Sequence, residues 1–386
     1  MRILQVVRQY LPSTGGMETY VSTLCRELLA RGHEADVATL DYLFYQDRRL
    51  PSYERIENTD VIRLPSAGNP RYFLAPRLWQ LLPRYDLIHI HGVDFFADFM
   101  GALKKIHGRP VVLSTHGGFF HTGWFPLFKK MYFHSVTRLA LIGVDRVIAS
   151  SPVDRQLFSQ ISGRVSLVEN GIDFRRFAAV RKSMDGETLL FVGRISKNKR
   201  VDRLLEALAR LRQDRPEARL EVVGPDWEGL QEKLRQQAEA LGIGGAVTFR
   251  GALPPEEVLE ELARARLFVS ASEYEAFGIS TVEAMAAGTV PVVNRIQACE
   301  DIIEDGETGY LTDFARTEQA SGTLGRALEL SDERLLKMGE RARERASRYD
   351  WQNVAAEIVG IYEDVLGEKK AKTRHAQPTS KRHHDR

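Results

Sequence analysis

The chain has 386 residues and a formal net charge of +2, with 43% hydrophobic and 27% charged residues. This length allows two or three domains with large cores, and this composition excludes a disordered or membrane-spanning chain. Only Cys25 and Cys299 are present, which argues against a disulfide framework or a thiolate metal site. With no signal peptide and no apolar run long enough to span a bilayer, we expect a cytoplasmic protein.

The charges are unevenly distributed along the chain. Basic residues outnumber acidic ones in residues 1–180 and 369–386, whereas acidic residues prevail in 181–368. A basic N-terminal half could face anionic lipid or a phosphorylated acceptor, and an ordinary solvated surface explains it equally well. We expect residues 369–386 to form a disordered basic tail, with either a weak membrane contact or no role.

Short β-branched runs alternate with amphipathic stretches along the first 150 residues. This pattern is typical of a parallel sheet with helices on both faces. It predicts a helix at Gly16–Ala30, closed by Gly32, and strands at 2–7, 35–39, 86–91, 110–115 and 146–149. These elements form one doubly wound domain.

The same pattern restarts after the turn-rich segment Asn170-Gly171-Ile172-Asp173. It predicts helices at 201–212 and 230–241 and strands at 189–192, 220–223, 247–249, 267–269 and 290–293. Residues 351–366 read as a final amphipathic helix. We predict an N-terminal Rossmann-like domain at 1–170, a C-terminal one at 171–350, a C-terminal helix at 351–368 and the basic tail at 369–386.

Two carboxylates stand around a glycine turn in the segment Ser272–Ala284. Glu275 lies in the loop, and Glu283 lies in the first turn of a helix expected to begin near Ser280. The free N–H groups of a helix start favour an anion such as a diphosphate, and the carboxylates can accept hydrogen bonds from sugar and ribose hydroxyls. Ser280 and Glu283 also form an S-x-x-E capping box, which explains Glu283 without a ligand. Glu275 has no such local explanation.

Other polar residues follow predicted strands, where ligands bind in open α/β sheets. Gly15 and Gly16 follow the first strand and let the backbone approach a phosphate, although a glycine pair alone is a weak signal. Arg194 and Lys199 offer two cations to a diphosphate, with an ordinary charged loop as the alternative. His116 stands beside small residues and favours a polar contact in a cleft between the two domains.

Together these residues resemble family four of the retaining glycosyltransferases, whose GT-B fold consists of two facing Rossmann-like domains with an interdomain cleft. The resemblance runs in order over about residues 1–352. The segments Val7–Tyr10, His89–Phe96 and Ser114–Thr122 look like those of the xanthan-type α-1,3-mannosyltransferases of exopolysaccharide assembly. That branch of the family moves mannose from GDP-mannose to a polyprenyl-diphosphate-linked oligosaccharide.

The resemblance implies a role for each candidate residue. As catalytic residues, Arg194 and Lys199 would neutralise the donor diphosphate, His116 would contact the transferred sugar near the reacting carbon, and Glu275 would hold sugar hydroxyls. The implied donor-binding residues are Gly15, Gly16, Phe277, Gly278, Ile279 and Glu283, the last of them on the ribose. The family retains anomeric configuration by departure and attack on the same face, so the two glutamates are not assigned as a hydrolase pair.

No metal cofactor is expected, because the sequence holds neither a D-x-D motif nor a cluster of His, Cys and Asp. His89 and His91 are two apart on a strand without a third ligand, so we interpret them as acceptor contacts or core. The chain departs from the family pattern in two places. Gln297-Ala298 stands where many relatives have two glycines, and Arg200 stands where glycine often follows the lysine.

The segment Phe119–Phe133 is rich in aromatic residues and contains the pair Lys129-Lys130. This composition is typical of a membrane-surface helix and equally of a core helix. It leaves open a peripheral contact with anionic lipid at the inner face of the cell membrane.

The sequence thus predicts a retaining, metal-independent glycosyltransferase whose partners are a nucleotide-sugar donor and a lipid-linked saccharide acceptor, with no nucleic acid. Three alternatives stay open: a sibling transferase that uses a UDP-sugar, a nucleotide-sugar epimerase of the same architecture, and a non-catalytic sugar- or nucleotide-binding protein.

Overall fold

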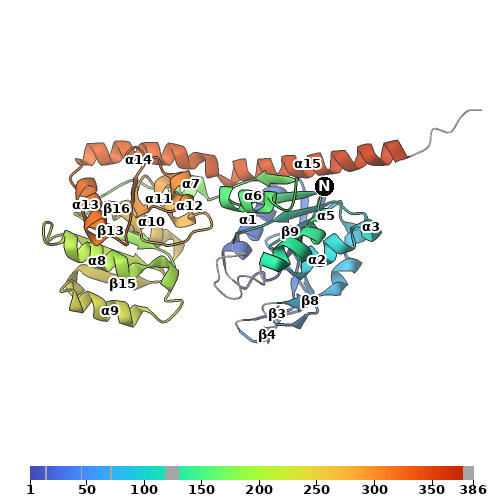
Figure 1. Ribbon diagram of the computed structural model, residues 1–386, viewed down its shortest axis with the longest axis horizontal. Helices are drawn as coiled ribbons and strands as arrows, with labels where there is room; N and C mark the ends of the chain where they lie inside the picture. Colours follow the sequence, from blue (N-terminus) through green and yellow to red (C-terminus); the bar gives the residue numbers. More distant parts are fainter. Residues whose placement is uncertain (14, 45, 70–71, 118–129, 377–386) are drawn as a thin grey trace, which may run out of the picture. The chain divides into compact units, whose positions relative to one another are not determined.

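The computed structural model describes residues 1–13, 15–44, 46–69, 72–117 and 130–376, which form two compact units (Figure 1). The first unit consists of Met1–Glu169 and Gln352–Arg386, and the second of Asn170–Trp351. Each unit is built around one predominantly or wholly parallel sheet.

The first unit contains an eight-stranded sheet of order β12-β11-β10-β9-β1-β2-β6-β5. Its strands are β1 (Arg2–Val7), β2 (Glu34–Leu40), β5 (Tyr53–Ile56), β6 (Thr59–Leu64), β9 (Leu87–His91), β10 (Val111–Ser114), β11 (Arg146–Ala149) and β12 (Val165–Leu167). Neighbouring strands are parallel except for β5 and β6, which are antiparallel. The chain runs outward from β1 through β2 and then returns to β9, so the strand order reverses between β1 and β9.

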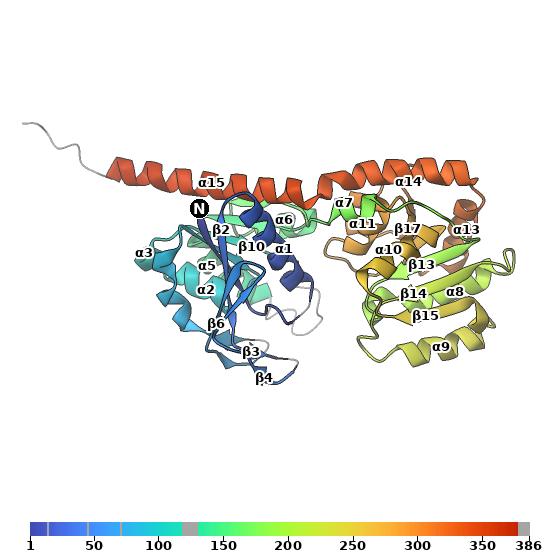
Figure 2. The ribbon, with the colours of Figure 1, turned by 180° about the vertical axis from the view of Figure 1, so that it is seen from behind.

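The two faces of this sheet bury different kinds of side chain. On one face, Leu4 and Ile90 join a hydrophobic cluster with Phe96 of α2 (Phe95–Ala102) and with Phe133, which precedes α5 (Arg138–Ile142). Successive side chains of a strand alternate between faces. The opposite face therefore carries Gln5, which contacts the last helix, α15 (Trp351–Ala376). Helix α1 (Gly16–Ala30) also covers this face (Figure 2).

Residues 42–84 contain short elements that the sequence pattern did not predict. They form the two-residue strands β3 (Tyr42–Leu43), β4 (Arg48–Arg49), β7 (Ala67–Gly68) and β8 (Phe73–Leu74) and the turns of helix Pro76–Gln80 and Leu82–Arg84. Strands of two residues are too short to show the alternation that identifies a strand in a sequence.

The second unit contains a six-stranded parallel sheet of order β15-β14-β13-β16-β17-β18. The strands are β13 (Thr188–Val192), β14 (Arg219–Val223), β15 (Val247–Gly251), β16 (Leu267–Ser270), β17 (Val290–Asn294) and β18 (Tyr310–Thr312). The strand order reverses between β13 and β16.

Helices cover both faces of this second sheet. One face packs on α8 (Val201–Leu211), α9 (Gln231–Ala240) and α13 (Thr317–Leu328), with Leu189 and Leu204 in the cluster. The other packs on α11 (Ile279–Ala286) and α14 (Asp332–Ala346), with Leu190 and Met285 in the cluster. The predicted α/β class, with two doubly wound parallel sheets, is confirmed.

The C-terminal helix differs from its predicted bounds. It begins at Trp351 as expected but continues to Ala376, so the prediction of a disordered tail from residue 369 is wrong for residues 369–376. These residues include Lys, Ala and Arg, which favour a helix once one has started. Residues 377–386 lie outside the described part of the chain. Among the described residues, no helix combines the length and the apolar character needed to cross a bilayer.

Candidate functional site

The loops after β13 and β16 meet at the point where the strand order of the second sheet reverses. These strands are parallel neighbours, so their carboxyl ends lie at the same edge of the sheet. Lys199 of the first loop and Glu275 of the second form an ion pair there, with Nζ 2.6 Å from Oε1. Both side chains are 17% exposed, so the pair is shielded yet still reachable by a ligand.

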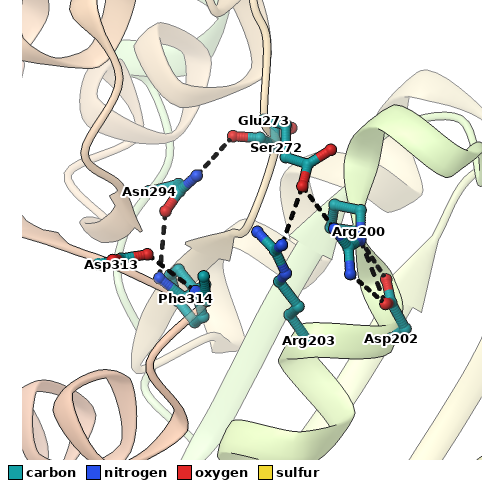
Figure 3. Close-up of polar contacts among 9 residues, drawn as sticks. Arg200, Asp202, Arg203, Ser272, Glu273, Asn294, Asp313 and Phe314 are labelled. Carbon is teal, nitrogen blue, oxygen red and sulfur yellow. Dashed lines mark hydrogen bonds and ion pairs between the residues drawn. The ribbon is translucent and has the colours of Figure 1, made fainter.

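Hydrogen bonds to backbone carbonyl groups hold these two loops together. The Nδ2 group of Asn198 donates to the carbonyl of Tyr274 at 2.8 Å, and the N–H of Glu273 donates to the carbonyl of Asn198 at 3.0 Å. From the other side, Asn294 donates to the carbonyl of Ser272 at 3.0 Å (Figure 3). The position of Glu275 relative to Lys199 is therefore fixed by the backbone as well as by the ion pair.

Arg200 has a left-handed conformation, with φ at +49°. Glycine adopts this conformation without strain, whereas a residue with a Cβ atom such as arginine is disfavoured in it. Arg200 instead forms an ion pair with Asp202 at 2.7 Å and one with Glu273, which also pairs with Arg203 at 2.9 Å (Figure 3). The departure from the family pattern thus gives the loop a charged connection to Glu273.

The second predicted cation, Arg194, is exposed and lies outside the Lys199 pair. Its guanidinium carbon lies 4.9 Å from the centre of the Trp227 ring. Stacking on the aromatic face orients the guanidinium without using its N–H donors, which remain able to bind an anion. The sequence interpretation missed Trp227, which follows the neighbouring strand β14 and bears no motif of its own.

Helix α11 begins at Ile279, directly after the Glu275 loop. Its N-cap is Gly278, with φ at +97°, and no side chain caps the helix. The capping-box alternative for Ser280 and Glu283 is therefore wrong, because Ser280 already lies inside the helix. Phe277 is buried and packs edge-on against Tyr349, with ring centres 5.1 Å apart. This anchor holds the start of the helix, with its unpaired N–H groups, beside the Lys199–Glu275 pair.

Glu283 is the fifth residue of α11 and is half-buried, so the prediction that it lies in the first turn is wrong. Burial raises the pKa of its carboxyl to about 7, although Arg176 acts in the opposite direction. Whether protonated or ionised, this carboxyl group can accept a hydrogen bond from a hydroxyl group of a ligand.

Stability should therefore depend on the proton of Glu283. The folded protein keeps this proton up to about pH 7, whereas an unfolded glutamate loses it near the ordinary glutamate pKa of 4.5. The folded state binds more protons between these values, so the free energy of unfolding falls as pH rises, by up to about 3 kcal/mol. In urea titrations from pH 4.5 to 7.5, Glu283→Gln should flatten this fall, and the exposed Glu257→Gln should leave it in place. An unchanged slope in Glu283→Gln would contradict the assignment.

In the first unit, Gly15 and Gly16 lie at the start of α1, after β1. A Cβ atom on Gly16 would meet nothing within 4 Å, so the backbone is open to a ligand there. A Cβ atom on Gly15 would lie 2.5 Å from Oε2 of Glu18, whose other oxygen accepts a hydrogen bond from Ser13. A diphosphate at this helix start would therefore require the Glu18 carboxylate to turn away.

His116 follows β10 and has a left-handed backbone, with φ at +53°. Asp154 stabilises the residues on both sides of it, because one carboxylate oxygen accepts from Oγ1 of Thr115 at 2.6 Å and from the N–H of Gly117 at 2.8 Å. Burial lowers the pKa of His116 to about 4, so the imidazole is neutral at pH 7. Its Nε2 lies 2.8 Å from Nδ1 of His91.

The structure thus gathers the candidates into two groups. The residues of the second unit lie in the loops after β13 and β16 and in α11, and those of the first unit lie at the carboxyl ends of β1 and β10. His89 and His91 are fully buried, so the core interpretation is right for both. Residues 118–129, which include most of the predicted membrane-surface segment, lie outside the described part of the chain.

The chain is similar to known glycosyltransferases in sequence and in fold. The family profile described as "Glycosyl transferases group 1" matches residues 173–345, and the profile described as "Glycosyltransferase Family 4" matches residues 14–176. The chain is 32% identical over 372 residues to the GDP-mannose:cellobiosyl-diphosphopolyprenol alpha-mannosyltransferase of Xanthomonas oryzae pv. oryzae, covering 95% of this chain and 98% of that one.

The protein of the same name from Komagataeibacter xylinus is 33% identical over 373 residues, covering 95% of this chain and 94% of that one. Among solved structures, sucrose-phosphate synthase from Thermosynechococcus elongatus is similar in fold, with a TM-score of 0.75 at 21% identity. The match covers 95% of this chain and 100% of that one.

Proposed function

Because this chain belongs to family 4 of the glycosyltransferases, we propose that it transfers mannose from GDP-mannose to a polyprenyl-diphosphate-linked saccharide. The chain is a glycosyltransferase enzyme of the GT-B fold. The donor and acceptor are proposed because two relatives that match nearly the whole chain are named for GDP-mannose and a diphosphopolyprenol-linked acceptor.

The observation that carries the proposal is the Lys199–Glu275 pair beside the start of α11. When the bond between the sugar and the diphosphate breaks, negative charge grows on the departing phosphate. Lys199, Arg194 and the free N–H groups of the helix start supply positive charge for it, which is why we propose a reaction without a metal cofactor. Glu275, held in place by Lys199, is an acceptor for the hydroxyls of the transferred sugar.

The bond changes follow from retention of configuration. The C1–oxygen bond to the diphosphate breaks, and a new bond forms from C1 to the acceptor hydroxyl on the same face of the sugar. The proton of that hydroxyl passes to the departing phosphate oxygen, so no enzyme nucleophile is needed. In this proposal Glu275 and Glu283 position the donor and form no covalent intermediate.

A transfer assay tests the donor, the acceptor and the metal together. Labelled GDP-mannose, UDP-glucose and UDP-N-acetylglucosamine are each incubated with a lipid-diphosphate disaccharide in EDTA, and with no acceptor in parallel. We expect label to enter the lipid from GDP-mannose alone. Transfer only from a UDP-sugar would overturn the donor, loss of transfer in EDTA would overturn metal independence, and donor conversion without acceptor would indicate an epimerase.

We also propose that the first unit contacts anionic membrane through residues 130–142, a continuous helical segment that ends with α5. Met131, Leu139 and Ile142 on this helix are 62%, 67% and 72% exposed. Residues 130–142 contain Lys130 and Arg138 and no acidic residue. Exposed apolar side chains flanked by basic ones suit a surface that meets lipid, and a lipid-linked acceptor resides there.

Vesicle sedimentation tests this contact. The double variant Leu139→Ser/Ile142→Ser should bind vesicles of phosphatidylglycerol and phosphatidylcholine about tenfold more weakly than the unmodified protein, since two apolar side chains no longer enter the lipid. The control is Leu241→Ser/Leu336→Ser, which changes two exposed leucines of the second unit. Equal binding by both variants would refute the proposal.

A further inference from the structure

A chain of hydrogen bonds leads from His116 through the sheet of the first unit to the C-terminal helix. It joins side chains of β1, β9, β10 and α15, in the order His116, His91, Gln5, Tyr362, His89 and Ser114. The bond lengths are 2.8, 2.7, 3.4, 2.6 and 2.8 Å in this order. The register of the strands puts Gln5 opposite His89 and Ser114 opposite His91, on the same face of the sheet.

The three histidines joined by these hydrogen bonds, His89, His91 and His116, are neutral at pH 7. Burial lowers the pKa of His116 to about 4 and lowers the pKa values of His89 and His91 well below 6.5. A neutral imidazole has one N–H donor and one acceptor nitrogen. Each hydrogen bond in the chain therefore decides the direction of the next one.

Gln5 sets that direction because its two ends are chemically different. In the amide orientation that the structure gives Gln5, Oε1 lies 2.7 Å from Nε2 of His91 and can only accept, so this orientation places the proton of His91 on Nε2. Nδ1 of His91 then has no proton and must accept from Nε2 of His116. At its other end, the amide of Gln5 donates to the hydroxyl of Tyr362, which leaves the phenolic proton for Nδ1 of His89.

We propose that Gln5 is a positioning residue that holds His116 as its Nε2–H tautomer, so that Nδ1 of His116 accepts a hydrogen bond from a hydroxyl of the transferred sugar. This inference rests on the proposed function for the sugar, but the tautomer itself does not. Among the described residues, none donates to Nδ1 of His116, and the side chain is partly exposed. Tyr20 packs edge-on against the ring at 4.6 Å and limits its rotation.

The opposite orientation of the Gln5 amide would reverse every bond in the chain. His91 would then donate through Nδ1, and His116 would carry its proton on Nδ1 and present a donor. A single amide, on the strand next to β9, therefore determines which kind of hydroxyl contact His116 can make. Asp154 fixes the position of His116 for this contact, because it accepts hydrogen bonds from the neighbouring residues Thr115 and Gly117.

Ring-nitrogen NMR of the full chain labelled with ¹⁵N-histidine tests the tautomer without any substrate. His116→Gln identifies the signals of His116 among those of the ten histidines. We expect protonated Nε2 and unprotonated Nδ1 in the unmodified protein, and a mixture of both tautomers in Gln5→Leu, which keeps the side-chain size but removes the acceptor. A proton on Nδ1 in the unmodified protein, or an unchanged tautomer in Gln5→Leu, would overturn the proposal.

Tyr362→Phe is the matched control, because it also removes two hydrogen bonds from the same chain but leaves the bonds from Gln5 to His91 and from His91 to His116. It should leave the tautomer of His116 unchanged. With whichever donor the enzyme turns over, Gln5→Leu should lower kcat/KM about tenfold more than Tyr362→Phe does, at a temperature where circular dichroism shows both folded. Equal losses in both variants would mean that Gln5 acts only on stability.

Discussion

Replacing Glu275 by alanine is expected to lower kcat about a hundredfold while the protein remains folded. The variant removes the acceptor for the sugar hydroxyls and leaves Lys199 without its partner at 2.6 Å. Removing one preorganised polar group from a transfer site costs on the order of 3 kcal/mol of transition-state stabilisation. Initial rates of mannose transfer at saturating donor, with circular dichroism on the same samples, measure this effect.

Glu273→Gln is the matched control for Glu275→Ala. Glu273 lies two residues away on the same loop and is also ion-paired, with Arg200 and Arg203, but it is 47% exposed and has no proposed contact with the donor. Exposed ion pairs contribute about 0 to 1 kcal/mol, so we expect at most a few-fold loss of rate. If both variants lost activity equally, the loop as a whole would matter and Glu275 would have no special role.

Gly224→Ala is expected to produce the largest loss of stability. Gly224 follows β14 with φ at +138°, and a Cβ atom there would lie 2.0 Å from the carbonyl oxygen of Gly193. Gly193 begins the loop that carries Arg194 and Lys199, so the added methyl group must push that loop or strand β14 aside. The clash and the unfavourable backbone together should cost about 3 kcal/mol or more in the free energy of unfolding.

Thermal unfolding followed by circular dichroism measures this loss. For a unit of this size, about 3 kcal/mol lowers Tm by about 9 °C. Gly229→Ala separates the two causes, because Gly229 also has a positive φ of +68° but a Cβ atom there would meet nothing within 4 Å. It should cost about 1 to 2 kcal/mol. A Tm for Gly224→Ala no lower than that of Gly229→Ala would show that the loop absorbs the clash without cost.

The regular part of the fold could be predicted from the sequence, because buried parallel strands are continuous β-branched runs such as Leu189–Val192. The strand β1 and the helix α1 have the bounds that the pattern predicts. The strands β3, β4, β7 and β8 could not be predicted, since two residues are too short for a period. The longer strands β5 and β6 were missed because their apolar residues do not alternate strictly with polar ones. The C-terminal helix was predicted too short because charge and low hydrophobicity were read as disorder.

The candidate site could be predicted only where a residue stands at the end of a recognisable strand, as Arg194, Lys199 and Glu275 do. Its supporting contacts join residues far apart in the sequence. Asn198 binds Tyr274, and Gln5 binds Tyr362, which is 357 positions away. No local pattern marks such pairs. The environment of Glu283 was misread for the same reason, because a spacing that suits a capping box says nothing of burial.

Because the first unit consists of two segments separated in sequence by the second unit, it can be completed only at the end of translation. Helix α15 supplies Tyr362 and Ile358, both fully buried, and these residues are translated only after the whole of the second unit. The second unit is continuous in sequence and can complete its core on the ribosome. The face of the first sheet that carries Gln5 and His89 is covered by α1 alone until α15 emerges. A chaperone that shields this face would therefore have to stay bound to the first unit until the whole of the second unit has been translated.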